Sequence, residues 1–480
     1  MQSQHFIDGQ WTATDRWTDS LDPANGELIG CFADGGEAEA EAAVAAAARA
    51  FNDPQWAQNP RLRQQLLLEW AAGLTARQEQ LAQLLTRENG KALAQSRGEI
   101  GGAISEILYY AGLARHNPGH MLEVAPGEFS SMLREPAGVA GLIIPWNAPA
   151  VLLVRALAPA IAAGCTVVIK PAPQTALFNA AMLEPLFALP GLPAGAVNLF
   201  TESGHAGAAH LVASPRVDVL SFTGSTATGQ RIMRDCAATM KKLSLELGGK
   251  SCCLVFEDAD IAAIAPKLAA AATIISGQQC TAARRVLVHA SRFAEMKTAL
   301  SAALGRIRLG NGLDPATNMG PLIDWQSRDS VERRIGEALD SCDEVLLAGG
   351  RPQGELGNGA FLAPSLIAHR DSSAFFCQEE IFGPLLVLES FEDEAEAVAR
   401  ANHTEFGLSA SVWTGQGARA WRVARALRNG TVWLNDHNKL FAEAETGGYR
   451  KSGLGRLHGV DALLDFSELK HIYQNVGTLG

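Results

Sequence analysis

Short apolar runs alternate with helix-forming segments from residue 139 onward, and this alternation restricts the fold more than any other feature. The runs "VAGLII", "CTVVIK", "AVNLF" and "VDVLSF" are each followed by a helical stretch. The alternation resumes after Glu246 with "CCLVF", "RVLVH", "EVLLAG", "PLLVLESF", "SASVW" and "TVWLN". Strands that alternate with helices form parallel βαβ units. We therefore predict an α/β protein with two doubly wound domains in series.

Two extended segments fall outside this alternation. Residues 120–136 form two short runs around a Pro-Gly turn, which predicts a hairpin, and the C-terminal "LKHIYQNV" predicts a further strand. Unpaired strands of this kind can pair with another subunit, so we expect a homodimer or homotetramer. The expected division is 1–118 with 137–247 for one domain, 248–450 for the second, and 119–136 with 460–480 for a small β oligomerisation element.

The charge and the cysteines exclude several classes of protein. The formal net charge is −11 over 480 residues and no basic block offsets it, which argues against nucleic-acid and anionic-membrane partners. The eight cysteines are dispersed without a C-x-x-C pair, and the start lacks the pattern of a signal peptide. We expect reduced thiols in a cytoplasmic protein. The eleven histidines show no paired ligand spacing, so no metal site is expected.

An uncharged segment, residues 137–154, approaches the length of a membrane span. Pro145 and Pro149 would break a spanning helix, Asn147 is polar at its centre, and Arg155 follows at once. A buried strand, a turn and a helix fit this segment better.

Polar or small residues follow successive predicted strands. They are Trp146, Asn147, Lys170, Gly224, Ser225 and Glu246. Ligands of an open α/β sheet bind at the carboxyl ends of the strands, so these residues predict one crevice. In "FTGSTATG", the helix start and the Ser225 hydroxyl suit a phosphate, although an ordinary helix cap is the alternative. The dinucleotide fingerprint G-x-G-x-x-G is absent.

The stretch "SGQQCTAARR" places Cys280 before a basic pair. A free cysteine most often packs as a small hydrophobe, so this stretch alone does not assign it a role. The adjacent Cys252 and Cys253 lie in an apolar run and are predicted to be core residues.

Seven motifs together resemble the aldehyde dehydrogenase superfamily. In chain order they are "PWNAP", "IKPAP", "FTGST", "LELGGK", "GQQC", "EEIFGP" and "GGYRKSGLGR". The resemblance covers nearly the whole chain, and "LELGGK" followed 34 residues after its glutamate by the cysteine is highly specific. It implies Rossmann-like domains, an aldehyde substrate, and NAD or NADP bound at a G-x-x-x-x-G turn that matches Gly224 to Gly229.

The resemblance also implies a role for each matching residue. Cys280 would attack the aldehyde, the Asn147 amide and the Cys280 N–H would stabilise the oxyanion, and Glu246 would activate the hydrolytic water. The implied cofactor-binding residues are Pro145, Trp146, Lys170, position 203 (a serine beside Gly204), Gly224, Ser225, Gly229, Leu247, Glu380 and Phe382. The substrate pocket would include Arg155, Gln279 and His437.

Several positions depart from the common family pattern. Pro173 stands where many members have a glutamate, Ala148 where many have an aromatic residue, and Glu445 and Thr446 where Pro-Phe is usual. Arg155 replaces a frequent tryptophan. These departures favour a small or polar aldehyde and open the cofactor choice to NADP.

Three alternatives to a hydrolytic dehydrogenase are open at this stage. A CoA-acylating relative would pass the thioester to CoA, although Glu246 argues against it. A cysteine hydrolase would pair Cys280 with a histidine. A non-catalytic relative would keep the fold as a binding or structural protein.

Overall fold

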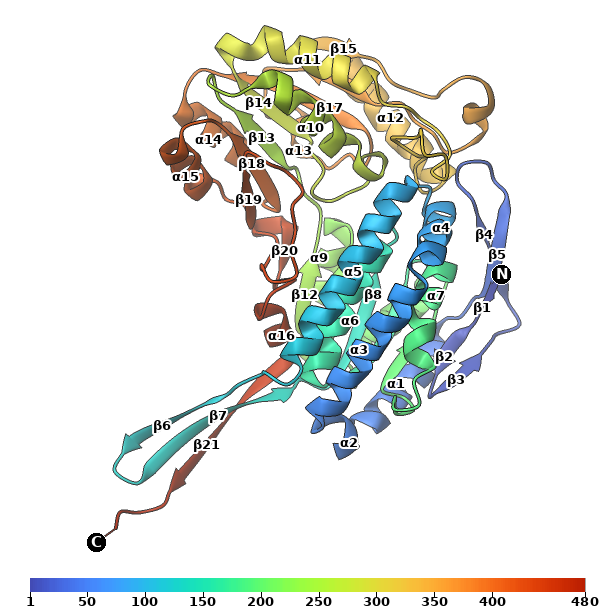
Figure 1. The fold of residues 1–480 in the computed structure, drawn as a ribbon, viewed down its shortest axis with the longest axis vertical. Helices are drawn as coiled ribbons and strands as arrows, with labels where there is room; N and C mark the ends of the chain where they lie inside the picture. Colours follow the sequence, from blue (N-terminus) through green and yellow to red (C-terminus); the bar gives the residue numbers. More distant parts are fainter. Residues whose placement is uncertain (480) are drawn as a thin grey trace.

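The computed structural model describes residues 1–479 and contains two large sheets, a small N-terminal sheet and a protruding arm (Figure 1). The first large sheet has the order β20-β12-β11-β8-β9-β10-β2-β3, and its five central strands are parallel. The chain order reverses between β8 and β11, which creates a crevice at their carboxyl ends. The strands are β2 (His5–Ile7), β3 (Gln10–Thr12), β8 (Val139–Ile144), β9 (Thr166–Pro171), β10 (Val197–Leu199), β11 (Val219–Thr223), β12 (Lys242–Glu246) and β20 (Gly453–Leu454).

Helices cover both faces of this sheet because its strands are apolar on both sides. In β9, Val167 and Ile169 pack into one core while Val168 packs into the other, as the two-residue period of a strand requires. The first core includes α3 (Pro60–Ala76), α4 (Gln78–Asn89), α5 (Leu93–Leu113), α6 (Pro149–Ala163) and α7 (Ala176–Phe187). The second includes α1 (Glu37–Phe51), α8 (Ala206–Ala213) and α9 (Thr226–Cys236). The short α2 is Pro54–Ala57.

The second large sheet has the order β15-β16-β17-β14-β13-β18-β19 and is parallel except at the β15–β16 pair. Its strands are β13 (Cys252–Val255), β14 (Arg285–His289), β15 (Glu344–Leu347), β16 (Ser365–Ala368), β17 (Leu385–Phe391), β18 (Ser409–Trp413) and β19 (Thr431–Leu434). Its helices are α10 (Ile261–Thr273), α11 (Phe293–Gly305), α12 (Trp325–Ser341), α13 (Phe375–Gln378), α14 (Glu394–Asn402) and α15 (Gly417–Ala426). The prediction of two doubly wound, Rossmann-like α/β units is confirmed. The strand predicted at "EVLLAG" is an antiparallel edge rather than part of a parallel unit. The strand β16 was not predicted.

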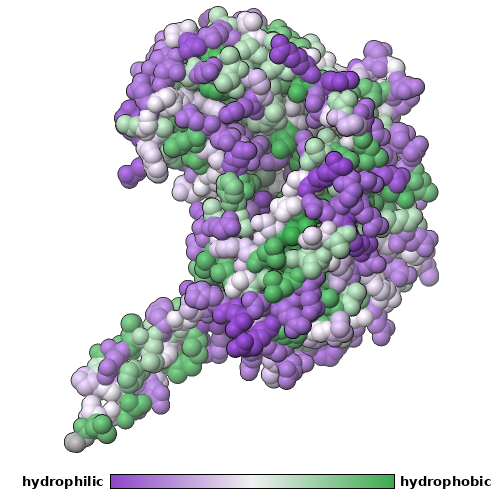
Figure 2. Space-filling model, in the orientation of Figure 1, coloured by the Kyte–Doolittle hydropathy of each residue, from purple (hydrophilic) through white to green (hydrophobic). Residues whose placement is uncertain are grey.

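The hairpin and the C-terminal strand form the arm (Figure 1). The strands β6 (His120–Ala125) and β7 (Glu128–Pro136) make the hairpin, and β21 (Ser467–Asn475) pairs antiparallel with β7 along its whole length. Apolar side chains gather on the arm in Figure 2, and exposed ones there are Met121, Leu122, Val124, Leu133, Leu469, Ile472, Tyr473 and Val476.

Two further parts complete the chain. The N-terminal sheet, with the order β1-β5-β4, was not predicted; it consists of β1 (Gln2–Ser3), β4 (Trp17–Leu21) and β5 (Leu28–Ala33). The short α16 (Asp461–Asp465) precedes β21. The uncharged segment 137–154 folds as β8, a turn and the start of α6, as predicted, and within residues 1–479 no helix combines the length and apolarity needed to cross a membrane.

Candidate active site

Cys280 follows a backbone turn of unusual conformation. Ile275, Ser276 and Gly277 have consecutive φ angles of 47°, 56° and 76°. The left-handed region is unfavourable for a β-branched residue such as Ile275, so surrounding contacts must hold the turn. The Ser276 hydroxyl donates to the Gly320 carbonyl at 2.7 Å. The turn presents the half-buried Cys280 to a cavity.

A buried arginine fixes the backbone around the cysteine. Arg284, 1% exposed, donates through Nη1 to the Gly383 carbonyl at 2.7 Å and through Nη2 to the carbonyls of Gly277 and Gln279. Its guanidinium also lies 5.8 Å from the centre of the Phe382 ring. Arg284 therefore joins the cysteine loop to the loop that carries Glu380 and Phe382.

Asn147 lies between β8 and α6, at the crevice where the strand order reverses. Its Nδ2 donates to the Gln278 carbonyl at 3.0 Å, and the side chain lines the same cavity as Cys280. An amide has two N–H donors, so one remains for a ligand. The arrangement suits an oxyanion formed beside the cysteine.

Glu246 is the last residue of β12 and also lines the cavity. It is 8% exposed, and its Oε1 is buried without a hydrogen-bond partner. Burial raises the pKa of this carboxyl to about 8, against the opposing charges of Arg456 and Arg155. A group with this pKa can accept and release a proton near neutral pH.

The Cys280 thiol is protonated at rest. Burial raises its pKa to about 12, and the negative charges of Glu380 and Glu246 add to this effect. Attack by sulfur therefore requires an acceptor for the thiol proton, and Glu246 shares its cavity.

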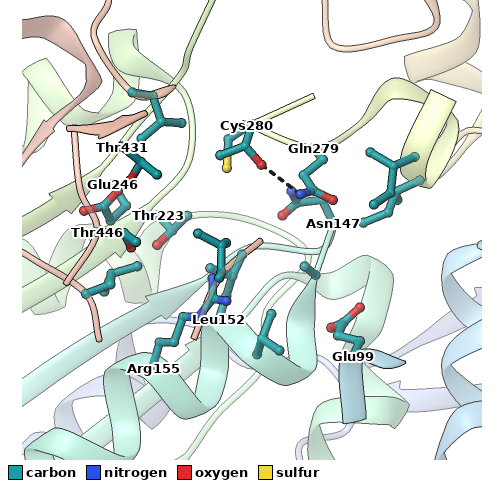
Figure 3. A pocket seen from close by; sticks show the side chains of 18 of the residues that line it. Glu99, Asn147, Leu152, Arg155, Thr223, Glu246, Gln279, Cys280, Thr431 and Thr446 are labelled. Atoms are coloured by element: carbon teal, nitrogen blue, oxygen red, sulfur yellow. Dashed lines mark hydrogen bonds between the residues drawn. The ribbon is translucent and has the colours of Figure 1, made fainter. Parts of the chain in front are cut away.

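Figure 3 shows the cavity from close by. Its volume is about 300 Å³. It brings together the predicted residues Cys280, Asn147, Glu246, Arg155 and Gln279. Its other lining residues are Gln95, Gly98, Glu99, Ala148, Val151, Leu152, Thr223, Leu247, Ile274, Ile275, Thr281, Leu408, Thr431, Leu440, Thr446, Gly447 and Leu457. The apolar residues among these make the walls less polar than the sequence suggested. The contribution of α5, through Gln95, Gly98 and Glu99, was not predicted.

His437 does not line this cavity, contrary to its predicted place in the substrate pocket. Its Nε2 contacts the Thr281 carbonyl at 2.9 Å and its Nδ1 contacts the Ser411 hydroxyl at 3.1 Å. Burial lowers its pKa to about 4, so the imidazole is neutral and supports the backbone beside the nucleophile.

The predicted adenosine side of the cofactor site lies at the ends of β9 and β10. Burial lowers the pKa of Lys170, whose Nζ lies 3.9 Å from Glu202 Oε1. Both oxygens of Glu202 accept N–H groups at the start of α8, at 2.8 and 2.9 Å. Ser203 donates to Asp34 through its N–H and its hydroxyl, both at 2.7 Å. Glu202 and Asp34 had no recognisable motif in the sequence.

The predicted phosphate side lies at the start of α9. Ser225 caps this helix by accepting the Thr228 N–H at 3.3 Å. Gly229 permits close packing, because a Cβ there would lie 2.5 Å from Leu247 Cδ2. Gly224 packs in the same way against the Phe222 ring, since a Cβ at this position would lie 2.4 Å from Phe222 Cζ. This helix start has the shape and dipole that suit a dinucleotide phosphate.

The residues predicted to bind the nicotinamide follow or precede strands of both large sheets. Glu380 Oε1 accepts the Gly249 N–H at 3.0 Å, and burial raises the pKa of this carboxyl. Trp146, which follows Pro145 at the end of β8, meets Phe382 edge to face with 5.7 Å between ring centres.

Comparisons with known proteins agree with this arrangement. The model of the "Aldehyde dehydrogenase family" matches residues 11–472. Betaine aldehyde dehydrogenase of Bacillus subtilis (strain 168) is 37% identical over 99% of this chain and 98% of its own. Succinate-semialdehyde dehydrogenase [NADP(+)] of Escherichia coli (strain K12) is 37% identical over 98% of this chain and 97% of its own.

A solved structure shares the fold over nearly the full length. The crystal structure of betaine aldehyde dehydrogenase from Staphylococcus aureus in complex with NAD+ has a TM-score of 0.96 at 34% identity, covering 99% of this chain and 96% of that one. With a family match over almost all of the sequence and the predicted nucleophile, amide and carboxylate around one cavity, this chain belongs to the aldehyde dehydrogenase family.

Proposed function

We propose that the substrate of this aldehyde dehydrogenase is a small semialdehyde, an aldehyde with an anionic group at its far end. The observation that carries the proposal is Arg155, which projects from α6 into the cavity opposite Cys280 (Figure 3). Its Nε is buried without a hydrogen-bond partner. A guanidinium binds a carboxylate through paired hydrogen bonds, and a buried unpaired donor favours a ligand that supplies the acceptor.

The acidic residues near the cavity do not favour a cationic substrate. Glu99 lines the cavity, but one of its oxygens pairs with Lys91 and the other accepts the Ala150 N–H at 2.8 Å. Glu445, one of the departures from the family pattern, accepts the Val460 N–H at 2.9 Å and does not line the cavity.

The cavity walls also disfavour a quaternary ammonium group such as that of betaine aldehyde. Such cations are recognised by aromatic faces, and none of the cavity-lining residues within 1–479 is aromatic. The substrate in the name of the Escherichia coli relative, succinate semialdehyde, therefore fits this cavity better than the betaine aldehyde in the name of the Bacillus subtilis relative.

The enzyme oxidises its aldehyde to the carboxylic acid with NAD or NADP. The Cys280 sulfur, after its proton passes to Glu246, adds to the carbonyl carbon, and the oxyanion accepts hydrogen bonds from the Asn147 amide and the Cys280 N–H. The bound nicotinamide supplies the acceptor for the hydride, which leaves a thioester on Cys280. Glu246 then releases the thiol proton to solvent and removes a proton from water, and the hydroxide adds to the thioester carbon. The sulfur leaves as a thiolate, which takes the proton back from Glu246 to restore the thiol as the acid departs.

This chain's own residues suit the dinucleotide. We assign the phosphates to Ser225 and the start of α9 between Gly224 and Gly229, and the adenosine ribose to Lys170. We assign the nicotinamide ribose to Glu380. The remaining predicted contacts are Pro145, Trp146, Ser203, Leu247 and Phe382.

We further propose a homodimer or homotetramer assembled through the arm, because its strands expose apolar side chains beyond the body of the subunit (Figure 2). We also propose a cytoplasmic location. Within the described residues all eight cysteines are free thiols, which persist in a reducing compartment.

Paired substrates test the substrate class. Succinate semialdehyde and butanal have the same number of carbons, but butanal lacks the carboxylate. We expect Arg155→Met to lower kcat/KM for succinate semialdehyde by roughly 100-fold, the worth of a charge-assisted bidentate contact. The value for butanal should fall by a much smaller factor, which reports only the loss of a positive charge near Glu246 and Cys280. Equal losses on both substrates, or a parent enzyme that prefers betaine aldehyde, would refute the proposal.

A further inference from the structure

One segment, from the end of α4 to the start of α5, holds the loop that carries Asn147. Asn89 Nδ2 donates to the Trp146 carbonyl at 2.7 Å, and Lys91 Nζ donates to the Asn147 carbonyl at 2.7 Å. Asn89 is 0% and Lys91 1% exposed. This loop joins β8 to α6, so these side chains supply hydrogen bonds that neither regular element provides.

The Lys91 ammonium has a matched counter-charge. It pairs with Glu99 Oε2, and the other oxygen of Glu99 accepts the Ala150 N–H in the first turn of α6 at 2.8 Å. A buried ammonium needs a hydrogen-bonded partner of opposite charge. The pair therefore anchors both sides of Asn147, its own carbonyl and the helix that follows it.

The same segment also contacts the other half of the site. The Leu93 N–H donates to the Gly312 carbonyl at 2.9 Å. A Cβ on Gly320 would lie 1.9 Å from the Gly90 carbonyl oxygen, so the two backbones touch. Gly320 is the residue whose carbonyl accepts the Ser276 hydroxyl in the turn before the nucleophile. The segment is thus a brace between the oxyanion donor and the cysteine loop.

We propose that Lys91 is a positioning residue for the oxyanion donor, with Glu99 as its neutralising partner. The inference rests on the proposed role of Asn147. The carbonyl that Lys91 binds is attached to the Cα that carries the Asn147 amide, so fixing the carbonyl restricts where the amide points. A displacement of about 1 Å is enough to lower a rate markedly, because the donor must meet charge that appears only in the transition state.

A double-mutant cycle with Asn147→Ala tests the proposal. The neutral pair Lys91→Met/Glu99→Gln removes both charges together, so it leaves no buried unpaired ion and is expected to fold. We expect it to lower the rate of the first turnover by about 10- to 30-fold, with less than threefold change in the KM for aldehyde. In the Asn147→Ala background the same pair should change that rate less than about twofold, since its target is gone.

Lys241→Met is the matched control. Lys241 is also buried and donates to two backbone carbonyls, those of Ser214 and Val217, but neither carbonyl belongs to the loop that carries Asn147. The Lys241→Met variant should have a lower unfolding temperature and an unchanged first-turnover rate.

Two results would overturn the inference. If the pair variant and Asn147→Ala multiply their effects, Lys91 acts independently of the oxyanion donor. If Asn147→Ala by itself leaves the rate unchanged, the role of Asn147 is wrong and the inference falls with it.

Discussion

The ionisation of Glu246 should govern the pH dependence of thioester hydrolysis. Burial raises its pKa to about 8, so about one-tenth of the carboxyl is ionised at pH 7 and about nine-tenths at pH 9. A base acts in its ionised form, and hydrolysis should therefore accelerate about tenfold from pH 7 to pH 9. The same relation predicts a further decrease of about tenfold from pH 7 to pH 6.

Rapid mixing of enzyme, aldehyde and cofactor separates this step from hydride transfer. Absorbance of the reduced cofactor should show a fast first turnover followed by a slower steady state whose rate follows the ionisation of Glu246. Arg456→Met removes a positive charge that lowers the Glu246 pKa, so it should move the profile to higher pH. Glu246→Gln should slow the first turnover, because the Cys280 thiol loses the carboxylate that accepts its proton, and should lose the pH-dependent steady state. A steady-state rate that stays flat between pH 6 and pH 8 would refute the assignment of Glu246 as the base.

The same pKa predicts an effect on stability with a defined sign. Folding raises the pKa of Glu246 from 4.5 to about 8, so the folded state binds this proton more tightly. This tighter proton binding adds about 5 kcal/mol to the free energy of unfolding below pH 4.5. The added stability is lost as pH rises through 8. Glu246→Gln should therefore raise Tm more at pH 9 than at pH 5. Equal shifts at the two pH values would show that the carboxyl ionises freely in the folded protein.

Three further predictions follow from the site and the arm. Cys280→Ala should abolish turnover while cofactor binding, measured by calorimetry, stays within about threefold of the parent; turnover within tenfold of the parent would exclude it as nucleophile. Pro173 begins the short helix after β9 and offers no carboxylate to repel a 2′-phosphate, so the parent should use NADP readily. Pro173→Glu should raise the KM for NADP about tenfold more than that for NAD, and strict NAD dependence of the parent would indicate that another group, such as Glu202 beside Lys170, excludes the phosphate. Light scattering at micromolar concentration should show a dimer or tetramer, and replacing Leu469 and Ile472 on β21 by lysine should shift it towards monomer; a parent that is already monomeric would contradict the role of the arm.

The sequence alone determined the fold class and the catalytic candidates. A strand that is buried on both faces has a continuous run of apolar residues in the sequence. A helix has apolar residues every three or four positions, so both elements can be recognised from local sequence. Cys280, Asn147 and Glu246 lie within short motifs, and their chain order matches that of the family. The end of a parallel strand places its next residue at the crevice, which is why Asn147 and Glu246 could be located before any contact was known.

The tertiary structure decided how these residues are held and what surrounds them. Lys91 lies 56 residues from Asn147 along the chain, and Glu202 contacts Lys170 from another strand end. Such contacts leave no periodic pattern, because each depends on where two distant segments meet rather than on either segment's own sequence. His437 is a residue for which the sequence suggested a place in the site that tertiary packing did not provide. Its position suggested the substrate entrance, but packing turned both ring nitrogens towards Thr281 and Ser411.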